Sequence, residues 1–161
     1  MISDRRAILA ALLLLAALPV ATAAPNAGDA QKIEACLKAA AEKGASGVTC
    51  IGIVADPCIA AVREKDSATK DSAACAAREL AIWTTRLQRA VQSAGKGGGK
   101  TIATAVTASQ KSFTDSLAKL CPQFENLDPG MSLGGPTYCR LQETAMRVLV
   151  LERLAEAVNP H

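Results

Sequence analysis

The chain has 161 residues, and its 18 basic and 15 acidic side chains give a net charge of +3. This near balance, without a stripe of basic residues, argues against a nucleic-acid-binding protein. Half of the residues are hydrophobic, yet the aromatic ones are few: Trp83, Phe113, Phe124 and Tyr138. A core made mainly of Ala, Leu, Val and Ile must pack small side chains closely, which favours helices.

Residues 1–23 are expected to form a secretory signal peptide. Arg5 and Arg6 provide a charged beginning, residues 8–18 an apolar stretch, and residues 21–23 a small-residue cleavage site. The apolar stretch is shorter than the roughly 20 residues that a membrane-spanning helix needs. We therefore expect residues 24–161 to form a single domain, periplasmic or secreted, with no membrane attachment after cleavage.

The first half of the remaining chain predicts two short helices. The first should run from Asp29, as its N-cap, to Lys43, with Gly44 as the stop. Residues 48–54 are apolar and β-branched and could form a strand, although Gly52 and the shortness of the segment leave this open. The pair Asp56-Pro57 is a typical helix start, and this second helix should last to about Lys65.

The second half predicts three longer helices. Leu80, Trp83, Leu87 and Val91 form an apolar stripe on a helix that should end at Gly95, followed by a flexible loop over residues 95–99. A fourth helix should end at Cys121-Pro122, residues 123–136 should form a long loop, and a last helix should span residues 137–158. Apolar stripes and short connections together predict an all-α fold, a compact antiparallel bundle of four to five helices.

Six cysteines lie outside the predicted leader, and none of them forms a CxxC pair. In an oxidising compartment an even number predicts disulfides rather than a zinc site. Cys121 and Cys139 bracket a Pro- and Gly-rich segment, so their pairing is the one that the sequence supports best. For the other four, Cys36–Cys50 with Cys58–Cys75 is favoured over Cys36–Cys75 with Cys50–Cys58, although spacing alone leaves the connectivity open.

The residues that would support catalysis are scarce. The single histidine is the terminal His161, so a serine or cysteine nucleophile would lack its usual base. The acidic pairs Asp115 with Glu125 and Glu143 with Glu152 are better explained as surface charge than as a glycosidase pair. No metal or cofactor motif is evident. The sequence therefore predicts a protein that is not an enzyme.

Three motifs occur in order along the predicted helices. The first comprises Cys75, Glu79 and Trp83; the second Gln110, Lys111, Phe113 and Cys121; the third Cys139, Thr144, Ala145, Arg147 and Leu151. In order and spacing they resemble the LprI-like lysozyme-inhibitor domain of bacterial exported proteins. The resemblance implies a helical, exported, non-enzymatic protein in which Glu79, Trp83, Gln110, Phe113 and Arg147 are structural.

The chain also departs from this family at several polar positions. The family's aspartate after the tryptophan is Thr84, and its Arg-Asp pair before the cysteine is Leu117-Ala118. If these positions are structural, the charges were removed together and none is left buried without a partner. If they served partner binding, this chain has lost or changed that activity. We favour the structural role because the positions lie near the helix stripes. Arg147 then needs a new partner, for which Glu79 and Glu143 are the candidates.

Two function hypotheses follow. In the first, which the resemblance implies, the protein binds and blocks a lysozyme-like muramidase by inserting a loop that offers donors to the two catalytic carboxyl groups. Residues 95–100, with Lys96 and Lys100, and residues 128–137, with Ser132 and Thr137, are the candidate loops. The second loop is preferred because cysteines and prolines restrict it. In the alternative, the protein is a periplasmic structural or envelope-maintenance domain with an unknown protein partner.

Overall fold

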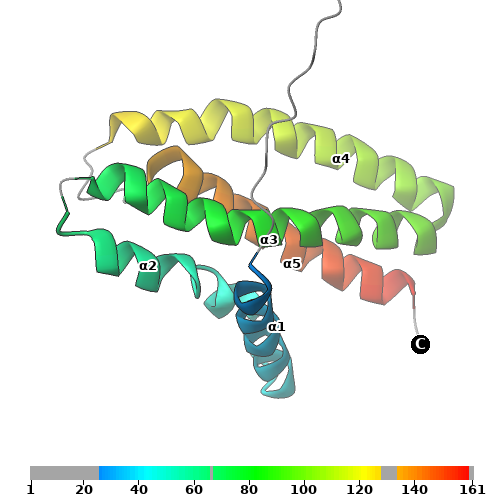
Figure 1. The fold of residues 1–161 in the computed structure, drawn as a ribbon. Helices are drawn as coiled ribbons and strands as arrows, with labels where there is room; N and C mark the ends of the chain where they lie inside the picture. The colour runs from blue at the N-terminus through cyan, green and yellow to red at the C-terminus, as the bar shows by residue number, and fades with distance from the viewer. Residues whose placement is uncertain (1–25, 66, 128–133, 160–161) are drawn as a thin grey trace, which may run out of the picture.

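A computed structural model describes residues 26–65, 67–127 and 134–159 of the chain. Over these ranges it contains five α-helices, two short 3₁₀ helices and no strand, which confirms the all-α prediction (Figure 1). The predicted signal peptide lies outside the described residues. No described helix is long and apolar enough to cross a membrane.

Three long helices form the main body of the fold: α3 (Ala68–Gly97), α4 (Gly99–Leu120) and α5 (Gly135–Val158). Figure 1 shows α4 running against α3 and α5, which point in the same direction. The largest packing interface joins α3 to α5. The bundle is therefore confirmed, but its central pair is parallel, because two reversals of direction separate the first of three consecutive helices from the third.

Small and branched side chains fill the space between α3 and α5. Trp83 is fully buried and belongs to the same core cluster as Leu141, Val148 and Leu151 of α5. Its place in the apolar stripe of α3 thus reflects a core position, as the sequence predicted. The buried alanines of both helices allow their backbones to approach closely; they are Ala76, Ala90, Ala94, Ala145 and Ala155.

The N-terminal part lies along one side of the bundle and comprises α1 (Ala27–Glu42), the 3₁₀ helix η1 (Gly47–Cys50) and α2 (Ala55–Val62) (Figure 1). The predicted N-cap Asp29 is wrong: Asn26 caps α1 by accepting the Gly28 N–H at 2.9 Å. The possible strand over residues 48–54 is not formed. Helix α2 already begins at Ala55 and ends at Val62, short of Lys65.

The predicted flexible loop over residues 95–99 is wrong as well. Helix α3 continues to Gly97 and α4 begins at Gly99, so Gly98 alone separates them. Gly99 has a φ of +67°, which a side chain would strain, and this permits the sharp reversal. The buried Ala94 anchors the end of α3 in the core, so packing overrides the weak helix propensity of the glycines.

The other end of the bundle contains the second 3₁₀ helix, η2 (Cys121–Asn126). This helix occupies the first part of the predicted loop 123–136, whose residues 128–133 lie outside the described ranges. The three disulfides are Cys36–Cys50, Cys58–Cys75 and Cys121–Cys139, which confirms the favoured connectivity. Each one joins two consecutive elements of the chain, and together they indicate an oxidising compartment.

Candidate functional site

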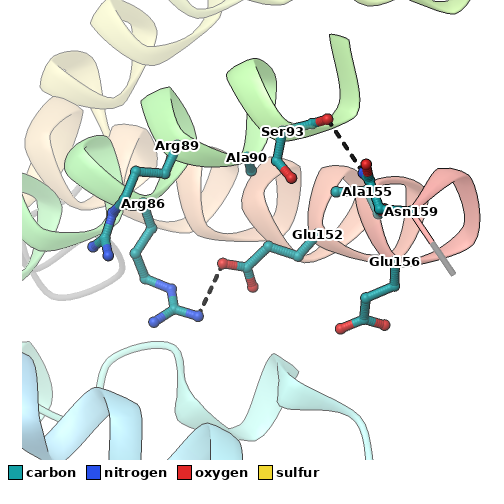
Figure 2. Close-up of a pocket in the computed structure, with 8 residues that line it drawn as sticks. All are labelled: Arg86, Arg89, Ala90, Ser93, Glu152, Ala155, Glu156 and Asn159. Atoms are coloured by element: carbon teal, nitrogen blue, oxygen red, sulfur yellow. Dashed lines mark hydrogen bonds and ion pairs between the residues drawn. The ribbon is translucent and has the colours of Figure 1, made fainter. Parts of the chain in front are cut away.

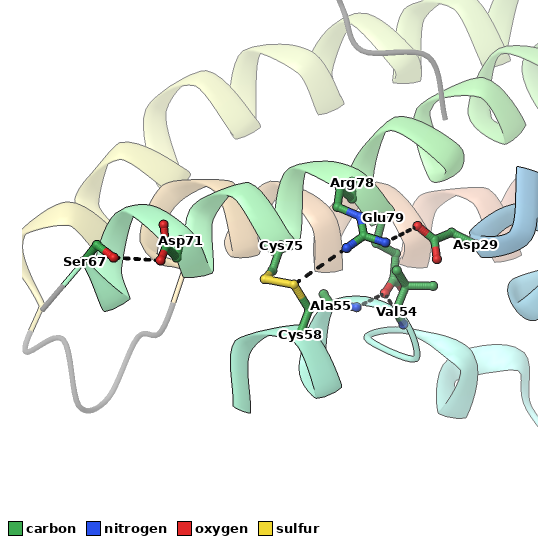
Figure 3. Close-up of a disulfide and its surroundings, with 9 residues drawn as sticks. All are labelled: Asp29, Val54, Ala55, Cys58, Ser67, Asp71, Cys75, Arg78 and Glu79. Atoms are coloured by element: carbon green, nitrogen blue, oxygen red, sulfur yellow. Dashed lines mark hydrogen bonds and ion pairs between the residues drawn. A yellow bond between two sulfur atoms is a disulfide. The ribbon is translucent and has the colours of Figure 1, made fainter. Parts of the chain in front are cut away.

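Glu79 is a fully buried carboxylate on α3, and it accepts four hydrogen bonds. Its Oε1 atom accepts the Gly52 N–H at 2.8 Å and the indole N–H of Trp83 at 2.9 Å. Its Oε2 atom accepts the N–H groups of Val54 at 2.9 Å and Ala55 at 2.8 Å; Figure 3 shows these two contacts. The lone pairs of a buried charge are therefore well occupied by donors.

These contacts make Glu79 the cap of helix α2. Val54 stands at the N-cap position of α2 and has no side-chain acceptor of its own. A carboxylate from α3 supplies the missing acceptor and a negative charge at the positive end of the helix dipole. The spacing Glu-x-x-x-Trp thus places a charge and its indole donor one helical turn apart. Glu79 and Trp83 are both fully buried and hydrogen-bonded to each other.

An ion pair lies beside this cap. The Arg78 guanidinium contacts the buried Asp29 carboxylate at 2.6 Å and lies 3.9 Å from the Sγ atom of Cys58 (Figure 3). Asp29 is on α1, Cys58 on α2 and Arg78 on α3, so this cluster fastens both N-terminal helices to the bundle.

Arg147 on α5 has different partners from those expected. It donates to the Gln110 side chain at 3.4 Å and to the Ser109 hydroxyl, and it lies 5.8 Å from the ring centre of Phe113. Within the described ranges, neither Glu79 nor Glu143 pairs with it, so that expectation is wrong. Both carboxylate oxygens of Glu79 already accept other hydrogen bonds, whereas Gln110 and Phe113 of α4 lie next to Arg147. Gln110, Phe113 and Arg147 thus form one contact between α4 and α5.

Sequence reasoning missed Arg86, which connects three helices. It pairs with Glu34 of α1 and, at 2.9 Å, with Glu152 of α5. Burial raises the pKa of the Glu152 carboxyl, and the charge of Arg86 acts in the opposite direction. Figure 2 shows Arg86 and Glu152 in a groove of about 380 Å³ between α3 and α5. Glu152 therefore forms an ion pair that links α5 to α3.

The candidate binding residues lie at opposite ends of the bundle. Lys96 is in the last turn of α3 and Lys100 is at the start of α4, whereas Thr137 is in the first turn of α5. Helix α3 has 30 residues and is therefore about 45 Å long. The lysines and Thr137 consequently cannot share one site. Ser132 lies outside the described residues.

A cleft of about 390 Å³ adjoins Thr137 at the end of the bundle where α3 and α5 both begin. Lys70 of α3 lines it, and Phe124 and Leu127 provide an apolar wall. Leu127 is 45% exposed, so part of this apolar wall faces solvent. The N-termini of two parallel helices add partial positive charge to this end, while Glu125 in the wall and Asp71 nearby are acidic.

None of the protein-family models, curated proteins or solved structures compared with the chain matches it. The described residues also contain no cluster of His, Cys, Asp and Glu that could hold a metal ion. The resemblance to the lysozyme-inhibitor domain therefore depends on the motif residues alone.

Proposed function

We propose that the protein is an exported, non-enzymatic binder of a lysozyme-like muramidase, and that the cleft beside Thr137 is its contact surface. Three features support this proposal. The motif residues resemble the LprI-like domain, Glu79 and Trp83 among them are fully buried, and the three disulfides suit the periplasm or the cell exterior.

The observation that carries the proposal is the convergence of donors at this cleft. A muramidase active site holds two carboxyl groups that an inhibitor must engage. The Lys70 ammonium and the Thr137 hydroxyl both line this cleft and are donors at one end of the molecule. The exposed apolar surface of Leu127 would be buried in the contact.

A cell-wall lysis assay tests the proposal with protein purified in oxidised form from the periplasm of an expression host. We expect stoichiometric inhibition of at least one lysozyme-like muramidase. Thr137→Asp should weaken inhibition at least about tenfold by placing a negative charge against the catalytic carboxylates. This change leaves the fold intact, because an acidic residue in the first turn of a helix is favourable.

Lys70→Glu should weaken inhibition in the same way as Thr137→Asp. Lys100→Glu, at the opposite end of the bundle, is the matched charge reversal and should leave inhibition unchanged. Equal loss in all three variants, or no inhibition by the unmodified protein of any animal or bacterial lysozyme, would reject the proposal. The latter result would favour the alternative, an envelope-maintenance domain with another protein partner.

A further inference from the structure

The outer face of α5 presents two large apolar side chains to solvent. Glu143, Met146, Val150 and Arg153 are spaced three, four and three residues apart, so they lie on one face of the helix. Met146 is 44% exposed and Val150 is 55% exposed, which makes Val150 the most exposed of the large apolar side chains in the described ranges. The opposite face of α5 packs on α3, so this face is open along the middle of the helix.

Two exposed charges of opposite sign flank these apolar side chains. Glu143 stands on the N-terminal side and Arg153 on the C-terminal side, each three residues from the nearer apolar residue. Neither forms an ion pair with another residue that the structure describes. Read in the opposite direction, the face has the same order of one charge, two apolar side chains and one charge, but the positive charge now comes first. This face is thus complementary to itself in charge.

We infer that the outer face of α5 binds the same face of a second copy of this chain. The two α5 helices would run antiparallel around a twofold axis that passes between the levels of Met146 and Val150. Met146 then lies against Val150 of the second copy, and Glu143 comes near Arg153 of the second copy. A parallel arrangement would oppose like charges, which disfavours it. An interface that uses one patch from both subunits closes as a dimer and does not extend into a fibre.

The size of the patch determines how strong the dimer should be. The exposed apolar part consists of two side chains on one helix, which is far less than an obligate dimer buries. We therefore expect a weak dimer that forms in a concentration-dependent way. Because α5 is antiparallel to its counterpart, the clefts beside Thr137 would point to opposite ends of the dimer. The two copies could then engage partners at the same time.

Sedimentation equilibrium over a series of protein concentrations tests this inference on the protein purified from the periplasm of an expression host. We expect a reversible monomer–dimer equilibrium. Val150→Glu should raise the dissociation constant at least about tenfold, because it places a charge at the centre of the interface. Leu120→Glu alters a comparably exposed side chain, 47% exposed, on α4, and should leave the equilibrium unchanged.

Charge reversal gives the sharper test of the arrangement. Glu143→Arg alone should weaken the dimer, because it opposes two arginines across the interface. The double variant Glu143→Arg with Arg153→Glu should restore it, because both pairs are then attractive again. Any of three results would overturn the inference. The protein could stay monomeric at every concentration, Val150→Glu could leave the dimer unchanged, or the double variant could dimerise no better than Glu143→Arg alone. Circular dichroism confirms that every variant keeps its helical content.

Discussion

Glu79 shows how one side chain can fix the position of a whole segment. Its carboxylate comes from α3, whereas three of its four donors are backbone N–H groups between Gly52 and Ala55. The fourth donor, Trp83, is the largest fully buried side chain in the described core. Loss of the carboxylate would therefore leave buried donors unsatisfied both at the start of α2 and in the centre of the bundle.

We predict that Glu79→Gln lowers the free energy of unfolding by about 3 kcal/mol, because the amide replaces one acceptor oxygen by an NH₂ group that faces other donors. Urea denaturation of the oxidised protein measures this change. Glu64→Gln, at an exposed position just after α2, is the control and should stay within about 0.5 kcal/mol of the parent. Equal stability of the two variants would contradict the role assigned to Glu79.

Tyr138 provides a pH-dependent test of the same region. Its hydroxyl donates to the Asp56 carboxylate at 2.6 Å. Burial, this hydrogen bond and the negative charges of Asp56 and Glu79 raise the pKa of Tyr138 far above its usual value near 10. Above about pH 10 the unfolded chain loses this proton while the folded protein retains it. The folded state then binds more protons, so its stability must fall as the pH rises.

The prediction is that tyrosinate absorbance stays absent from the folded protein at about pH 11 and develops only on unfolding. Tyr138 is the one tyrosine of the chain, so the signal has a single source. Denaturation at about pH 9 and about pH 11 should show a loss of stability that Tyr138→Phe reduces. A folded protein that titrates near pH 10 would show that the hydroxyl is not held by Asp56.

Among the elements, the junction of α3 and α4 is where packing determines a structure that the local sequence does not predict. The stripe from Leu80 to Val91 correctly predicts the helix, but the glycines that follow it suggest a loop. Helix α3 nevertheless continues through Gly95, where an added Cβ atom would meet open space. At Gly98 the same atom would collide with the side chain of Ile102.

A matched pair of alanine substitutions tests this reading of the junction. Gly95→Ala should stabilise the protein by about 0.5 to 1 kcal/mol, because alanine favours a helix interior over glycine. Gly98→Ala should destabilise it, because Ile102 must move. Thermal and urea unfolding of both variants measure whether each substitution raises or lowers the free energy of unfolding. If residues 95–99 formed a flexible loop, both substitutions would have small effects of the same sign.

The N-terminal elements show where sequence reasoning fails for a physical reason. The donors of Gly52, Val54 and Ala55 are 24 to 27 residues away from Glu79, so no local pattern connects them. Arg86 shares a helix with the predicted stripe, but its partners Glu34 and Glu152 are 52 and 66 positions away. By contrast, cysteine spacing favoured the correct disulfides, because each bridge joins neighbouring elements.

At the scale of the molecule, the disulfides divide the fold into a firm centre and an attached N-terminal part. Cys121–Cys139 closes the connection from α4 to α5 within the three-helix body. Cys36–Cys50 instead joins α1 to η1, and α1 packs on the body through Ala30, Ile33 and Leu37 and through the pairs of Asp29 and Glu34 with arginines of α3. The Glu34 carboxylate is exposed, which makes its pair with Arg86 weak, so the disulfide should carry much of this attachment.

Removing these two disulfides should therefore have different spatial effects. Cys36→Ser with Cys50→Ser should accelerate hydrogen exchange in α1 and leave the protection of α3 and α5 almost unchanged, because α1 can open locally. Cys121→Ser with Cys139→Ser should lower protection throughout the body, since a closed loop of 18 residues contributes about 3 kcal/mol to global stability. Intact mass confirms that the other two disulfides form in each variant. A uniform loss of protection in the first variant would instead mean that α1 and the three long helices unfold as one cooperative unit.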